Sequence, residues 1–139
     1  MNHTQYDERR LRALANTLNH GIVTLVISMN NTAPDDKALS AALLEATLNV
    51  EIDVSDMRCK RLASSHDRSL LHIRNTLDAL SCHLYAAFQR RLIPAVDYAQ
   101  LKLIIVQMKF LIPEHLSAEG QPMVPLAADY QPRYRVQVR

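Results

Sequence analysis

The chain has 139 residues, the size of one ordinary domain, and 48% of them are hydrophobic against 22% charged, a balance that favours folding over disorder. It has two glycines, no tryptophan and 5% aromatic residues, which excludes glycine-rich nucleotide-binding loops and argues against a β-sandwich or barrel. The formal net charge of +2 does not by itself indicate a nucleic-acid or membrane partner.

Charge is distributed unevenly along the chain. Residues 1–57 carry eight acidic and four basic side chains, whereas residues 58–139 carry six acidic and twelve basic ones. The contrast is sharpest between residues 35–56 and residues 58–91. We expect these two stretches to be neighbouring helices that neutralise each other, and the alternative is a basic face for an acidic partner.

The cysteines and the apolar runs indicate the cellular compartment of the protein. Cys59 and Cys82 are the only cysteines, and their separation fits neither a metal site nor a small disulfide scaffold. Two free, buried thiols are expected. The polar first 20 residues do not resemble a secretory signal, and the run Ile22–Met29 is far too short to span a membrane. These features predict a cytoplasmic protein without a membrane partner.

The first predicted helix starts near Thr4, where Thr4 and Asp7 resemble a capping box. Its apolar side chains recur every three or four residues, as on one face of a helix, at Leu11, Leu14, Leu18, Ile22, Leu25 and Met29. Gly21 and the β-branched residues after it leave a strand over 22–28 as the alternative. A lone strand would need a partner, and the body of the chain offers no second strong candidate.

A second capping box is predicted at Thr32 and Asp35, with Pro34 in the first turn of the next helix. The inward stripe of that helix is Leu39, Leu43, Ala46 and Val50.

Residues 49–54 are ambiguous, because Val50, Ile52 and Val54 alternate as in a strand. We expect a kink or break near Ser55 or Asp56.

A third helix is expected after Ser64 and Asp67, another capping-box pair, and it should run to about Leu92. Its inward residues are Leu70, Ile73, Leu77, Leu80, Leu84 and Phe88. Pro94 ends it and starts a last helix.

The last predicted helix carries apolar residues on two sides. One stripe consists of Leu101, Ile104, Ile105, Met108, Leu111 and Ile112, and the second consists of Leu103, Val106 and Phe110.

These patterns predict an all-α, up-and-down bundle of four to five helices over residues 1–112. Residues 113–139 contain four prolines and a glycine and are expected to form an extended or disordered tail. Its end, Tyr134–Arg139, alternates like a strand and could pair with a partner.

No catalytic or metal constellation is found. Ser65, His66 and Asp67 are adjacent, so on a helix they point about 100° apart and cannot converge as a triad does. His72 and His83 share a helical face but lie roughly 16 Å apart, too far for one metal ion. We expect no cofactor and no enzymatic activity. The alternative, an enzyme that pairs one of these histidines with Asp78, has poor geometry.

A nucleic-acid-associated regulator is the second hypothesis for function. Its contact surface would be the basic C-terminal end and the stripe Arg58, Lys60, Arg61, Arg68 and Arg74. The stripe has no aromatic residues for base stacking, which weighs against single-strand binding.

Surplus apolar surface gives the leading hypothesis. A surface helix buries one stripe, yet Ile22–Met29 and residues 101–112 are apolar on two sides. We therefore expect a homodimer that acts as a small adaptor, inhibitor or regulator by binding another, unidentified protein. The expected interface residues are Val23, Ile27, Leu103, Val106, Phe110, Tyr130 and Tyr134.

Overall fold

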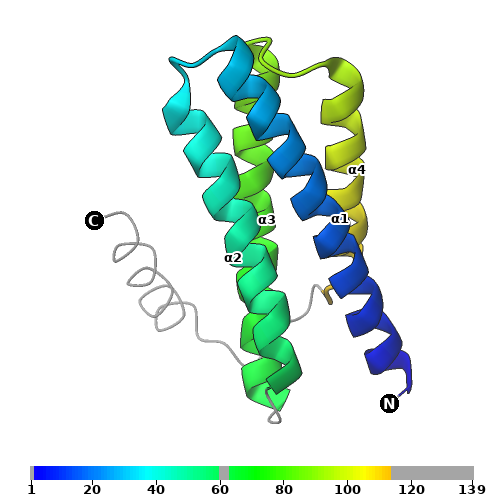
Figure 1. The fold of residues 1–139 in the computed structure, drawn as a ribbon. Helices are drawn as coiled ribbons and strands as arrows, with labels where there is room; N and C mark the ends of the chain where they lie inside the picture. Colours follow the sequence, from blue (N-terminus) through cyan, green and yellow to red (C-terminus); the bar gives the residue numbers. More distant parts are fainter. Residues whose placement is uncertain (1, 60–62, 114–139) are drawn as a thin grey trace.

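A computed structural model of the chain describes residues 2–59 and 63–113, with side chains described over residues 8–57 and 67–113. Its elements are the helices α1 (Asn2–Thr32), α2 (Lys37–Cys59), α3 (Ala63–Gln89) and α4 (Ala95–Phe110). Successive helices run up and down (Figure 1), and the described residues contain no strand. The predicted all-α bundle is confirmed, with four helices. The expected tail and its Tyr130 and Tyr134 lie outside the described residues.

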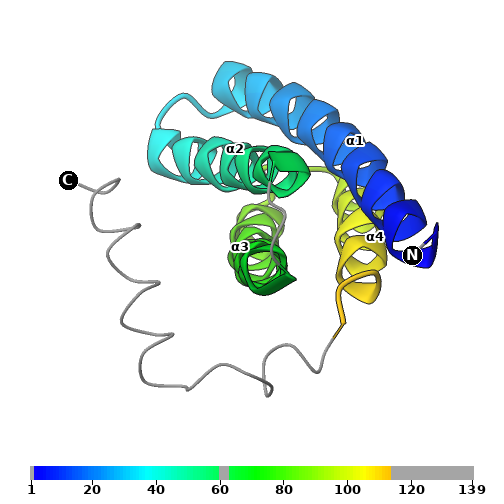
Figure 2. The same cartoon turned by 90° about the horizontal axis from the view of Figure 1, so that it is seen from below.

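The four helices are arranged in a ring. Helix α2 packs against α1 and α3, and α4 closes the ring by contacting α3 and α1 (Figure 2). The expected adjacency of the acidic and basic stretches is confirmed, because α2 and α3 form the most extensive helix pair. No described helix lies at the centre of the ring, so each of the four keeps one side outward.

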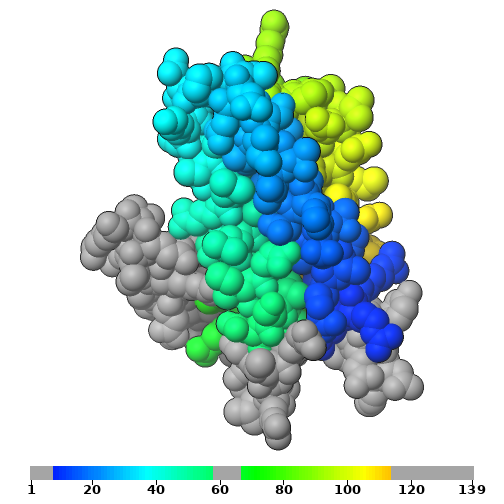
Figure 3. Space-filling model, in the orientation of Figure 1, coloured from blue at the N-terminus to red at the C-terminus, as the bar shows by residue number. Residues whose placement is uncertain are grey.

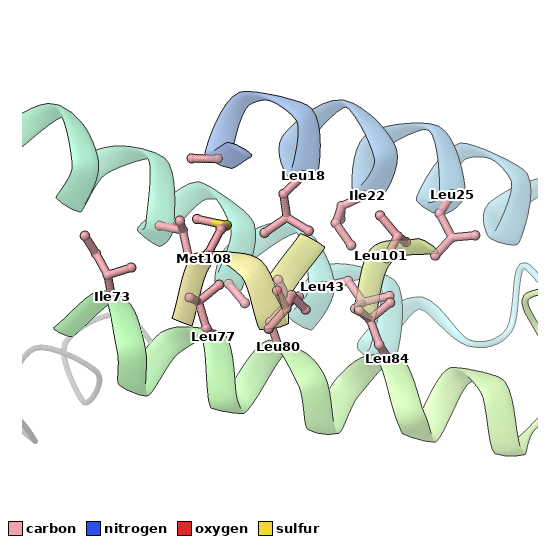
Figure 4. Packing of buried hydrophobic residues seen from close by; sticks show 14 of the residues in the cluster. Leu18, Ile22, Leu25, Leu43, Ile73, Leu77, Leu80, Leu84, Leu101 and Met108 are labelled. Carbon is pink, nitrogen blue, oxygen red and sulfur yellow. The ribbon is translucent and has the colours of Figure 1, made fainter. Parts of the chain in front are cut away.

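The core is a single aliphatic cluster that runs along the inside of the ring. Figure 4 shows side chains from all four helices pointing into it. Its fully buried large side chains include Leu11, Leu18, Ile22, Met29, Leu43, Ile73, Leu77, Leu80, Leu84, Ile105, Met108 and Ile112. The stripes predicted from the apolar spacing therefore face inward, with Leu14, Leu70, Ile104 and Phe88 at the margin.

Helix α1 is continuous through residues 22–28, as preferred over the strand alternative. Gly21 of α1 lies against Leu101 of α4. A Cβ atom at this position would come within 2.6 Å of Leu101 Cδ2. Because Gly21 has no side chain, Leu101 packs directly against the backbone of α1. This contact joins the first helix of the ring to the last.

The predicted start of α2 is wrong. Thr32 is the last residue of α1, and its hydroxyl donates a hydrogen bond back to the Ser28 carbonyl (3.0 Å). Helix α2 instead follows Asp36, whose carbonyl accepts the first helical bond, from the Ser40 amide (3.3 Å). A threonine hydroxyl can bond to the preceding turn as well as cap the next one, so the pattern alone does not decide between them.

The predicted kink or break near Ser55 is also wrong, because α2 is helical through Cys59. Val50 and Val54 are buried one turn apart, whereas Ile52 is exposed. Residues two positions apart point about 200° apart on a helix. The alternating run is therefore compatible with a helix in which Val50 and Val54 face inward and Ile52 faces outward.

Helix α3 ends in a Schellman motif that places Arg91 in the left-handed region, with φ of 60°. The Leu92 amide donates to the Ala87 carbonyl (2.9 Å) and the Arg91 amide donates to the Phe88 carbonyl (3.0 Å), which are the two bonds of that motif. Pro94 then stands at the N-cap of α4, as the sequence predicts.

Replacing Arg91 with glycine should stabilise the fold. Glycine adopts positive φ without the Cβ clash that an L-residue suffers there, and the exposed Arg91 side chain loses little. We expect the free energy of unfolding, measured by urea denaturation, to rise by about 0.5–1 kcal/mol. Arg91→Ala is the control, because it removes the side chain and keeps the backbone penalty; an equal gain in Arg91→Ala would contradict the backbone explanation.

Candidate interaction surfaces

The outward side of α4 carries a continuous row of exposed apolar residues. Leu103, Val106 and Phe110 are 57%, 52% and 89% exposed. Val96 and Ala99 extend the row toward the start of the helix, and both are exposed. The five residues follow one another at spacings of 3, 4, 3 and 4, the repeat of a coiled-coil seam. We call them the α4 seam.

The opposite side of α4 is fixed to the bundle by core packing and by contacts with α3. The Tyr98 ring stacks on Phe88 with centroids 4.5 Å apart and planes 7° apart. Lys102 Nζ lies 5.7 Å from the centroid of the same tyrosine ring. Further along, Lys109 Nζ pairs with the carboxylate of Asp78. These contacts hold the helix in one orientation, with the α4 seam facing away from the core.

Arg74 completes this attachment at the far end of α4. Its Nη2 donates to the carbonyl of Ile112 (3.4 Å) and to that of Pro113. Both carbonyls lie just after α4, which ends at Phe110, and the guanidinium supplies hydrogen-bond donors to them. Arg74 therefore fixes the end of α4 to α3.

Exposed aliphatic side chains also lie on α1 and α2, two helices that pack against each other. Ile27 of α1 is 58% exposed and Leu48 of α2 is 57% exposed. The other large exposed aliphatic residues of these helices are Val23, Leu44 and Ile52. The helices lie side by side on the front of the molecule (Figure 3), and Asn30 of α1 lines one shallow hollow with Leu44 of α2. We call these five aliphatic residues the α1–α2 face.

A groove of about 540 Å³ separates α1 from α4. Its α1 side is formed by small and polar residues around Gly21, and its α4 side includes Asp97, Gln100 and Leu101. The described contacts do not bring the polar groups of the groove together at one point, so we assign it no ligand.

The predicted interface residues fall on two different surfaces. Leu103, Val106 and Phe110 belong to the α4 seam, whereas Val23 and Ile27 belong to the α1–α2 face. Helix α4 packs against the other flank of α1, around Gly21, so the two sets do not merge. Five residues of these surfaces were not predicted from the sequence: Val96 and Ala99 of the α4 seam, and Leu44, Leu48 and Ile52 of the α1–α2 face. The heptad spacing back from Leu103 would have found Val96, but exposure alone distinguishes the three residues of α2.

The predicted basic stripe is described only in part. Arg68 is exposed, and Arg74 donates to the backbone carbonyls at the end of α4. The backbone of Arg58 belongs to α2, but its side chain, like Lys60 and Arg61, lies outside the described residues.

Other chemical groups do not form a site. His72 and His83 are both half-buried on α3, and the described residues hold no group of three His, Cys, Asp or Glu side chains that could bind a metal ion. Cys82 is free, but it is exposed rather than buried as expected. It lies on α3 five residues from the inward-facing Leu77 and Ala87, a separation that turns a side chain about 140° around a helix. Among the described helices, none combines the length and apolar character needed to cross a membrane.

Comparison of the chain with protein-family models, with curated protein sequences and with solved structures found no match.

Arg74 should contribute to stability through its carbonyl contacts. In Arg74→Met the apolar stem is kept and the donors are lost, so the free energy of unfolding in urea should fall by about 1–2 kcal/mol. Arg68→Met, an exposed position on the same helix, should change it by less than about 0.5 kcal/mol. Equal effects of the two substitutions would contradict an anchoring role for Arg74.

Proposed function

We propose that the protein is a non-enzymatic interaction module that forms a homodimer through the α4 seam and binds other proteins in that form. The observation that carries this proposal is the seam itself, five exposed apolar residues at heptad spacing on one side of α4. A second copy presents the same row of residues. Two copies related by a two-fold axis would bury both rows against each other and form a closed dimer.

Burial of the α4 seam supplies the driving force for association. Phe110 and Leu103 leave most of their surface in water in the single chain, and each fully buried large apolar side chain contributes about 1.5–3 kcal/mol. The seam is only about four turns of helix long. It therefore suits a dimer of moderate affinity rather than an obligate one.

The residues that flank the α4 seam favour parallel pairing of the two α4 helices. Lys102 and Lys109 lie on one edge, and Gln100 and Gln107 lie on the other. Parallel helices in a coiled coil bring opposite edges together, so lysine meets glutamine; antiparallel helices bring like edges together, so lysine meets lysine. Like charges placed opposite each other oppose association.

We place this module in the cytoplasm. Cys82 is an exposed free thiol, and a reducing compartment keeps such a thiol from forming disulfides.

Val106→Asp tests the interface. The new carboxylate would lie in the apolar seam of both copies, and the dissociation constant from sedimentation equilibrium should rise at least about tenfold, because a buried unpaired charge costs more than the 1.4 kcal/mol that a factor of ten represents. The fold should be kept, since Val106 is exposed in the single chain.

Leu48→Asp is the matched control for this test. It places the same charge on the equally exposed α1–α2 face and should leave the dissociation constant unchanged. Loss of dimer in the Leu48→Asp variant alone would show that the interface lies on the α1–α2 face, and the proposal for α4 would fail.

A further inference from the structure

The α1–α2 face combines exposed aliphatic side chains with carboxylates. Between Leu44 and Ile52 on the outside of α2, the exposed Glu45 and the half-buried Glu51 are interleaved with Leu48. This surface therefore offers apolar contact and negative charge within the same few turns of helix.

No positive side chain lies among these groups on α2. From Ala38 to Met57 the helix carries no lysine or arginine. On the α1 side, Arg9 and Arg12 line a hollow together with Glu51. Glu45 is exposed within this stretch, and Asp56 is exposed near its end, two residues before Arg58. A segment that fits this face must combine apolar and cationic residues.

The last ten residues of the chain have that composition. Residues 130–139 read Tyr-Gln-Pro-Arg-Tyr-Arg-Val-Gln-Val-Arg, with three arginines, two tyrosines, two valines and no acidic residue. Arginine and tyrosine are also the residue types most enriched at binding hot spots, because both combine apolar surface with strong hydrogen-bond donors.

The connection is long enough for the same chain to supply this segment. The described chain ends at Pro113 beside α3, where Arg74 holds it. The 16 residues from 114 to 129 can span up to about 53 Å, whereas packed helices lie about 8–10 Å apart. A connection of this length also gives an effective concentration in roughly the millimolar range, which favours the chain's own segment over that of another copy.

We propose that residues 130–139 bind to the α1–α2 face of their own chain, with tyrosine and valine side chains against Leu48 and Ile52 and with arginines beside Glu45 and Asp56. This contact covers the α1–α2 face, which takes no part in the proposed dimer interface. It makes the C-terminal segment an internal occupant that an external partner of the same basic and apolar chemistry would have to displace.

The full-length chain with Tyr134→Trp tests this contact, because the natural chain has no tryptophan. Its single indole should show blue-shifted emission relative to a synthetic peptide of residues 126–139 with the same substitution. Adding Leu48→Asp should return the emission to that of the peptide. Adding Glu45→Lys together with Asp56→Lys should weaken the shift, as should high salt.

Val106→Asp is the matched control on the α4 seam, and it should leave the blue shift intact. The shift should also be independent of protein concentration. Emission equal to that of the peptide, or a shift that Leu48→Asp leaves unchanged, would overturn the proposal. A shift that grows with concentration would also overturn it, because the segment would then come from another copy. Since Val106→Asp reports on dimerisation and Leu48→Asp on the segment, failure of one proposal can be told from failure of the other.

Discussion

A helix that is apolar on two sides can bury only one of them in a ring of four helices, and α4 is such a helix. Its inner residues Leu101, Ile105 and Met108 are buried, while Leu103 and Phe110 are left in water. The ring has no central position that could enclose both sides (Figure 2). The outward apolar row is thus a direct consequence of the architecture.

The polar contacts of α4 decide which of its sides faces outward. Tyr98 stacks on Phe88, Lys109 pairs with Asp78, and Arg74 holds the carbonyls at the end of the helix. All three contacts connect α4 to α3, and on its other flank Leu101 lies against Gly21 of α1. A rotation of α4 that buried its outer row would break each of them. The rigid presentation of an apolar row lowers the entropic cost of pairing with a second copy.

Periodicity was sufficient to predict the bundle and most of its core. The three- and four-residue spacing from Leu11 to Met29 and from Ile73 to Leu84 describes the buried stripes because aliphatic burial is the main driving force for folding. Local signals were less informative, because a hydroxyl such as that of Thr32 can serve either of two neighbouring helices. The alternation at Val50, Ile52 and Val54 was too short to separate a strand from a helix.

The candidate surfaces could be predicted only in part. Two apolar stripes on the last helix were visible in the sequence, but which of them is core depends on where α1 and α3 lie. The exposed residues of α2 were missed because Leu44, Leu48 and Ile52 are typical core residues by type. Their exposure follows from the tertiary arrangement, in which Asn49 and Asp53 are buried on the same helix.

Native mass spectrometry of the purified chain over a range of protein concentrations, at modest salt, tests the central claim most directly. The account predicts a species with twice the mass of the chain that gains population as the concentration rises. A single-chain mass at every concentration, with the α4 seam still in water, would contradict it.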